Sequence, residues 1–188
     1  MRKLLAVLCL SLLGHLGFGQ NTYYTVIQAG GNIGVQIPKY EGSFNGYSLH
    51  FIFGRNLNEK AFLGLGLGNE TLRGDYSKSA NTANEDVRTI KYDRNLFPIF
   101  IDGRLPFMDF GLVSKVGALA NVGYAPSIGP VYDRGFMGKM GFFYLYDSIR
   151  KTKFTVSATY AIQQLRGNFY ESNFTHQHIN LSVGIMLK

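Results

Sequence analysis

The residues of this chain whose types and spacing could do chemistry are its histidines and the serines near them. Ser48 and His50 lie two positions apart, as do His176 and His178. Ser182 follows His178 by four positions. Residues two or four apart on an extended strand share a face, so a histidine could act as a base toward a serine, or two imidazoles could share a metal ion.

A histidine–serine pair of this kind would suit the chemistry of barrel enzymes that trim acyl chains from lipid A. Such an enzyme needs the base within hydrogen-bond reach of the serine and a third group that orients the base. These side chains fall on the polar face of strands in which polar and apolar residues alternate. We expect that face to line the interior of a barrel, away from a lipid substrate. We therefore predict no catalytic residue and no metal site, and we interpret His176 and His178 as polar lining residues. The sequence contains no nucleotide-binding loop and no zinc-spaced His/Cys set, so no cofactor is expected.

Charged residues fall on the polar side of the same alternation, among them Glu70, Asp102, Lys115 and Lys139, and Arg104 shares that side with Asp102. Asp102 and Lys115 flank one short turn and are expected about one diagonal step apart on adjacent strands. Glu70 and Lys139 are expected nearer the opposite rim. An unpaired charge inside a narrow barrel is costly, whereas a hydrogen-bonded pair is tolerated. The sequence therefore predicts that these acids and bases pair and fill the barrel interior.

The elements that would position these residues are eight segments in which apolar and polar residues alternate with a period of two. One face of each segment is apolar and the other is polar or glycine-rich, as in a strand with two different environments. Pro98 interrupts the fourth segment and predicts a bulge there. The segments cover residues 27–37, 47–54, 63–70, 90–104, 112–124, 139–146, 154–163 and 178–187.

The predicted connections alternate in length along the chain. Short ones are expected at residues 55–60, 105–110 and 147–153, and longer ones at 38–44, 74–89, 126–136 and 166–174. Short turns at one rim and long loops at the other describe an up-and-down barrel with both termini at the short-turn rim. The predicted fold is therefore all-β, an eight-stranded antiparallel up-and-down β-barrel.

Alternation alone leaves open which face is wet, because a soluble barrel or sandwich would turn the same apolar residues inward. The polar face is rich in glycine, alanine and serine, which suits the narrow interior of an eight-stranded barrel. Aromatic residues stand near strand ends on the apolar face, as in an interfacial girdle. Long and short connections also segregate to opposite rims. These features favour a transmembrane barrel whose apolar face contacts lipid.

The first residues predict a cleaved signal peptide over 1–19. A basic start, Arg2-Lys3, precedes an apolar run from Leu4 to Leu13, and small residues follow before Gln20. Its removal would leave residues 20–188 as one barrel domain without Cys9, the only cysteine. Loss of Arg2 and Lys3 would lower the formal net charge from +7 to +5. The remaining positive charge is not clustered, so no nucleic-acid partner is expected.

The mature chain resembles the PorT-like and OmpA-like family of small outer-membrane β-barrels. The resemblance is carried by Gln20 after the leader, by residues 97–104 (FPIFIDGR) and by residues 179–185 (INLSVGI), and it spans essentially the whole mature chain. This chain departs from the usual pattern at its end, Met186-Leu187-Lys188, where outer-membrane barrels usually carry an aromatic residue. The resemblance implies an integral outer-membrane protein linked to secretion or envelope integrity, and it supplies no catalytic residues.

The expected function is that of a non-enzymatic barrel in the outer membrane of a Gram-negative bacterium, with both termini periplasmic. It would act as an envelope-stability element, a secretion accessory or an interaction platform. Its expected partners are outer-membrane lipid, lipopolysaccharide and other envelope proteins. A small pore and a lipid A-modifying enzyme are the alternatives. The candidate recognition residues lie in the long loop at 74–89 and are Asp75, Tyr76, Lys78, Glu85 and Asp86.

Overall fold

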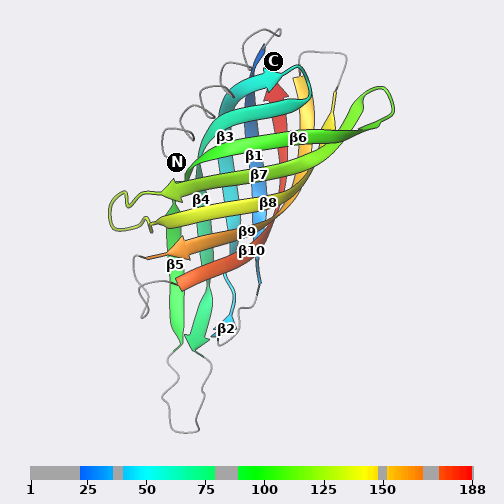
Figure 1. The fold of residues 1–188 in the computed structure, drawn as a ribbon. Helices are drawn as coiled ribbons and strands as arrows, with labels where there is room; N and C mark the ends of the chain where they lie inside the picture. The colour runs from blue at the N-terminus through cyan, green and yellow to red at the C-terminus, as the bar shows by residue number, and fades with distance from the viewer. Residues whose placement is uncertain (1–21, 36–39, 79–88, 148–151, 167–173, 188) are drawn as a thin grey trace, which may run out of the picture.

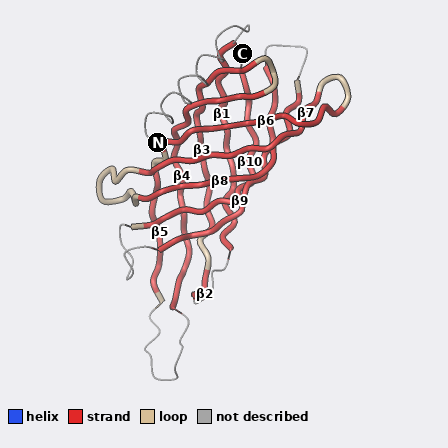
Figure 2. The backbone as a smooth tube through the Cα atoms, viewed as in Figure 1, coloured by secondary structure: helices blue, strands red, loops and turns tan. Residues whose placement is uncertain are grey.

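The structure is a computed structural model that describes residues 22–35, 40–78, 89–147, 152–166 and 174–187. Its regular structure is entirely β (Figure 2). None of the described residues forms a helix that is long and apolar enough to span a membrane. The leader predicted over residues 1–19 lies outside the described part of the chain. The strands are β1 (Thr22–Val35), β2 (Tyr40–Gly42), β3 (Asn45–Leu57), β4 (Ala61–Lys78), β5 (Ile90–Leu96), β6 (Ile99–Phe110), β7 (Ser114–Ala125), β8 (Gly135–Tyr146), β9 (Thr152–Leu165) and β10 (Phe174–Leu187).

Eight of these strands close into a ring (Figure 1). Each strand pairs antiparallel with its neighbour in the order β1, β3, β4, β6, β7, β8, β9 and β10. The ring closes between the last strand and the first, where Val183 of β10 lies opposite Ala29 of β1. The predicted eight-stranded antiparallel up-and-down barrel is therefore confirmed. The two short strands, β2 and β5, both pair with the outer part of β4.

The predicted bulge at Pro98 is wrong. β5 and β6 follow the same register along β4, since Leu96 lies opposite Glu70 and Ile99 lies opposite Leu67. Proline lacks an N–H and so interrupts the ladder without displacing it. The Pro98 carbonyl still accepts a hydrogen bond from the Gly68 N–H at 3.2 Å. The register shift of this strand lies instead between Pro106 and Met108.

The connections differ in length between the two rims, as predicted. The β3–β4 turn is tight, with Asn58 and Glu59 both at positive φ and the Lys60 N–H donating to the Leu57 carbonyl at 3.0 Å. The β6–β7 turn lies at residues 111–113, so the turn expected at 105–110 is the end of β6. Thr25 near the start of β1 lies opposite Leu187 at the end of β10, which places both strand ends at this short-turn rim.

The two faces of the barrel have opposite polarity. Large apolar side chains on the outer face are exposed, for example 66% for Leu65 and 62% for Val183. The polar partners in the alternation are buried inside, as predicted from the sequence. Glycine on the inner face leaves room for large side chains, because a Cβ at Gly66 would lie 2.3 Å from the Phe100 ring. The interior is therefore filled by buried polar and charged side chains together with apolar ones such as Phe62, Phe100 and Phe143, whereas the exterior is apolar.

Candidate functional site

The half of the interior nearer the short-turn rim is organised around Arg104 of β6. Its side chain and that of Asp102 are fully buried, and Arg104 Nε lies 3.0 Å from Asp102 Oδ2. Arg104 Nη2 donates to Gln28 Oε1 at 3.0 Å, and Nη1 donates to Thr155 Oγ1 at 3.3 Å. The guanidinium also lies 5.9 Å from the centre of the Phe143 ring, within the range of a cation–π contact. One side chain thus links β1, β6, β8 and β9 across the lumen.

A chain of hydrogen bonds extends this Arg104 layer to the last strand. Gln28 Nε2 donates to Ser182 Oγ at 2.6 Å, and Ser157 and Ser182 share a hydrogen bond of 2.7 Å. On the opposite side, the Tyr24 hydroxyl donates to Asp102 Oδ2 at 3.5 Å. Sequence reasoning placed Asp102 and Arg104 on one face but did not pair them. The Asp-x-Arg spacing on a strand with an inward polar face was the signal available for that pair.

A second buried charge cluster lies around Glu70 of β4. Glu70 Oε1 lies 2.5 Å from Lys139 Nζ and 2.8 Å from His50 Nε2, and all three residues are buried. The His50 ring also packs edge-on against Phe100, with ring centres 5.1 Å apart. The structure therefore brings Glu70 and Lys139 together inside the barrel. Their charges compensate each other in a place where either one alone would be costly.

The structure does not bring Lys115 to Asp102. Lys115 Nζ lies 3.4 Å from Glu59 Oε2 at the short-turn rim. Glu59 also contacts Lys153 at 3.2 Å, and Lys153 contacts Asp147. This rim cluster ties the β3–β4, β6–β7 and β8–β9 connections together. In the ladder Asp102 lies opposite Asn121 and Lys115 lies opposite Asp109, so the two are not diagonal neighbours, and Asp102 pairs with Arg104 on its own strand.

Among the described contacts, neither His50 nor His178 is bonded to the serine toward which it could act as a base. His50 contacts Glu70, whereas the Ser48 hydroxyl accepts a hydrogen bond from Asn180 Nδ2 at 3.0 Å. Ser182 is hydrogen-bonded to Gln28 and Ser157 in the Arg104 layer. The rings of His176 and His178 stack with centres 5.2 Å apart. In the described part of the chain, no group of three His, Cys, Asp or Glu side chains is placed to hold a metal ion.

An apolar cap covers the interior at the long-loop rim. Phe44, from the segment between β2 and β3, stacks on Tyr92 at 4.6 Å and packs against Phe174 at 5.9 Å. The Tyr92 hydroxyl donates to Asp133 Oδ2 at 2.9 Å. Arg73 of β4 and Asp93 of β5 form an exposed ion pair, so this end of the two strands lies beyond the apolar outer face. Burial raises the pKa of Tyr92, and the Asp133 carboxylate adds to the rise. The remaining buried members of the cap are Leu72, Leu96, Ala125 and Leu165.

The β7–β8 connection docks against the cap through its backbone. The Asn95 N–H donates to the Val131 carbonyl at 3.1 Å, and the Asp133 N–H donates to the Asn95 carbonyl at 2.8 Å. Arg94 Nη1 also donates to the Pro130 carbonyl. Sequence reasoning missed this cap, because its members come from connections and strands that are far apart in the chain.

The predicted recognition loop is shorter than expected. Asp75, Tyr76 and Lys78 belong to β4, where Asp75 lies opposite Lys91 of β5 and Lys78 lies opposite Tyr40 of β2. Backbone pairing on both sides extends the strand through a polar sequence that was predicted to be a loop. The other two predicted residues, Glu85 and Asp86, lie outside the described residues.

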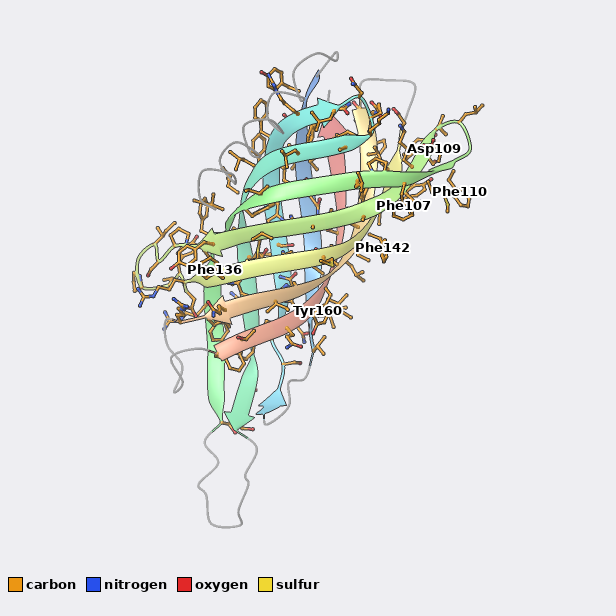
Figure 3. The ribbon with its side chains drawn as sticks, in the orientation of Figure 1. Phe107, Asp109, Phe110, Phe136, Phe142 and Tyr160 are labelled. Carbon is orange, nitrogen blue, oxygen red and sulfur yellow. The ribbon has the colours of Figure 1, made fainter. Side chains whose placement is uncertain are left out.

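Aromatic side chains mark both ends of the apolar outer face (Figure 3). Phe136 lies at the long-loop end of β8, whereas Phe107 and Phe110 lie at the opposite end, on the β6–β7 hairpin. Phe107 packs edge-on against Phe142 with ring centres 6.4 Å apart. The irregularity at Pro106–Met108 puts neighbouring residues Phe107 and Met108 both on the exposed side. Bulges commonly redirect side chains in this way.

Comparison with known proteins gives a structural similarity without a family. No family model matches the chain, so the resemblance to PorT-like and OmpA-like barrels stays a prediction. No curated protein matches it. Among solved structures, the chain is similar to the crystal structure of Neisserial surface protein A (NspA), with a TM-score of 0.49 and 15% sequence identity. That similarity covers 90% of this chain and 99% of the NspA chain. The closed antiparallel barrel rests on the strand pairings described above.

Proposed function

We propose that this protein is an integral β-barrel of a Gram-negative outer membrane and acts there without catalysis, as an envelope-stability element or interaction platform. The observation that carries the proposal is the reversed polarity of the barrel. Large apolar side chains cover the outside, while Arg104, Glu70 and Lys139 are buried inside. Soluble monomers rarely expose contiguous apolar patches beyond a few hundred square ångströms. A closed barrel in lipid satisfies its backbone hydrogen bonds and needs such an exterior.

The positions of the strand ends support an orientation in that membrane. β1 begins and β10 ends at the short-turn rim, which in single-chain outer-membrane barrels faces the periplasm. The long connections then lie outside the cell. Figure 1 shows β4 and β5 running past the ends of their neighbours on this side. A paired hairpin that stands above the membrane surface is suited to contact another envelope protein.

The filled lumen favours an anchor or platform over a pore. The Arg104 layer crosses the barrel from β1 to β9, and the Phe44–Tyr92 cap covers the long-loop end. Eight strands leave an interior just wide enough for side chains. These contacts among the described residues span the lumen, and they support an anchor or platform more than a pore.

Three measurements test the proposal. The membrane fraction extracted with detergent should contain the protein, and its gel mobility should differ between boiled and unboiled samples. Recovery in the soluble periplasmic fraction would contradict the membrane location. The protein in planar bilayers should show no stable conductance steps, since steps would favour the pore. Unchanged lipid A mass spectra with and without the gene are expected, and a changed acyl pattern would favour the enzyme.

A further inference from the structure

Two arginines face each other across the long-loop ends of β8 and β9. The last pair of the ladder is Met137 with Gln163, and three further residues in the same register would set Arg134 opposite Arg166. The Arg166 N–H donates to the Arg134 carbonyl at 3.0 Å, which shows that the backbones remain in contact there. The two residues are therefore cross-strand neighbours just beyond the last regular pair.

Both arginines belong to the outer face of the barrel. Gly135 and Leu165 are buried, whereas Phe136 and Ile162 on the alternate positions are exposed. Successive residues of an extended chain point to opposite faces, so Arg134 and Arg166 share the outward side with Phe136. Both arginines are exposed. Phe136, which Figure 3 shows at the long-loop end of β8, is two residues from Arg134, so the two arginines stand at the long-loop edge of the apolar outer face.

This pairing of like charges is unfavourable by itself. Like charges directly opposite each other on adjacent strands repel. In the described part of the chain, neither guanidinium contacts an acidic side chain. The nearby Asp133 is engaged elsewhere, because its Oδ1 accepts the Arg134 backbone N–H at 2.7 Å and its Oδ2 accepts the Tyr92 hydroxyl. An anion between the two guanidinium groups would remove the repulsion.

The backbone at this point is built for close approach. Gly135 has a φ of 156°, and a Cβ there would lie 2.0 Å from the Gln164 carbonyl oxygen. Only glycine allows β8 to come this near to β9. This close approach of the two chains keeps the backbones of Arg134 and Arg166 within hydrogen-bond distance, although the regular strands end here.

We propose that Arg134 and Arg166 bind the phosphate of a lipid headgroup in the outer leaflet. The guanidinium forks match phosphate oxygens with paired, charge-assisted hydrogen bonds. Phe136 and Ile162 lie on the same face, two residues from Arg134 and four from Arg166, and would contact the acyl chains of the same molecule. A free phosphate would gain nothing from those side chains, so the ligand is a phosphorylated lipid. The inference rests on the proposed membrane location and adds the lipid class that the protein holds.

The test compares binding of lipid A with binding of its fully dephosphorylated form, by native mass spectrometry of the detergent-solubilised, full-length protein. The variants are Arg134→Gln, Arg166→Gln and the double variant. Each single variant should bind lipid A about tenfold more weakly, the scale of one lost charge-assisted hydrogen bond. The double variant should bind both lipids equally. Arg55→Gln is the matched control, because Arg55 is exposed at the opposite rim and lies 5.3 Å from the Tyr23 ring.

The outcomes separate the inference from the proposed function. Undiminished preference of the double variant for phosphorylated lipid A would overturn the inference. Displacement of lipid A by equimolar inorganic phosphate would also overturn it, since the apolar contacts would then contribute nothing. Insertion into phosphatidylcholine vesicles, measured by heat-modifiable gel mobility, tests the membrane location separately. Wild-type protein that inserts but shows no phosphate preference refutes this inference alone, and protein that fails to insert refutes both.

Discussion

The guanidinium of Arg104 lies 3.0 Å from the carboxylate of Asp102 inside the barrel, although only one residue separates the two along β6. The strand period of two sends both side chains into the lumen, and both are fully buried. Neither charge can exchange its partner for water. The loss of one partner alone should therefore lower the stability of the barrel more than the loss of both.

Substitution of one partner should be far more damaging than substitution of both. Arg104→Met leaves the Asp102 carboxylate buried without its cation and is expected to cost about 3–5 kcal/mol. The double variant Asp102→Asn with Arg104→Met should recover most of that loss, because an apolar and a neutral polar group replace the pair. Urea unfolding in detergent micelles, followed by gel mobility, measures both. Additive costs in the double variant would show that the two groups do not depend on each other.

A charge on the outer face should be costly in proportion to its depth in the membrane. Leu67→Arg places a cation midway along β4 and should lower the free energy of unfolding by about 2–4 kcal/mol in lipid vesicles. Leu112→Arg is the control, because Leu112 is fully exposed in the β6–β7 turn and should cost about 0–1 kcal/mol. Guanidinium unfolding in vesicles gives both values. Equal costs at the two positions would contradict the lipid-facing assignment of this surface.

The glycines of the inner face should not tolerate even a methyl group where a large ring opposes them. Gly66→Ala would place a Cβ 2.3 Å from the buried Phe100 ring, which must then move. Overpacking of this kind costs about 1–3 kcal/mol. Gly31→Ala is the matched control on the outer face, since nothing lies within 4 Å of its Cβ position. A loss of stability that is the same in both variants would mean that strand propensity, not interior space, explains these glycines.

The hydrogen bond between Tyr92 and Asp133 should hold the β7–β8 connection on the cap. Tyr92→Phe removes that hydrogen bond and is expected to cost about 1–3 kcal/mol. Amide hydrogen exchange at Val131 and Asp133 should become faster, while exchange in β8 should not change. Unchanged protection of the connection would show that its backbone hydrogen bonds suffice.

The stabilisation from the Tyr92–Asp133 hydrogen bond should depend on pH only in the alkaline range. Because the pKa of Tyr92 is raised in the folded protein, its contribution is complete below about pH 10 and declines only as the pH rises further. The stability difference between wild type and Tyr92→Phe should therefore be constant from about pH 7 to 9. A difference that shrinks within this interval would show that another group governs the contact.

Alternation in the sequence was sufficient to predict the eight strands of the ring and which face of each points inward, but not where every strand ends. Side-chain direction in a strand depends on the local backbone alone, so Leu63, Leu65 and Leu67 could be assigned to one face from their spacing. Opposing glycines already indicated that this face is the outer one. The turn predicted at 105–110 was wrong. Proline and aspartate are common in turns, but pairing with β7 keeps Pro106 and Asp109 in a strand.

Only the tertiary structure decided which polar residues meet inside. Arg104 contacts Gln28 and Thr155, which lie 76 and 51 residues away in the chain, and Lys115 reaches Glu59 instead of Asp102. These partners depend on the tilt and stagger of strands around the closed ring, and no local pattern records that stagger. The sequence thus determined which side chains point inward, because that is a property of each strand. The closure of the barrel determined which of them touch.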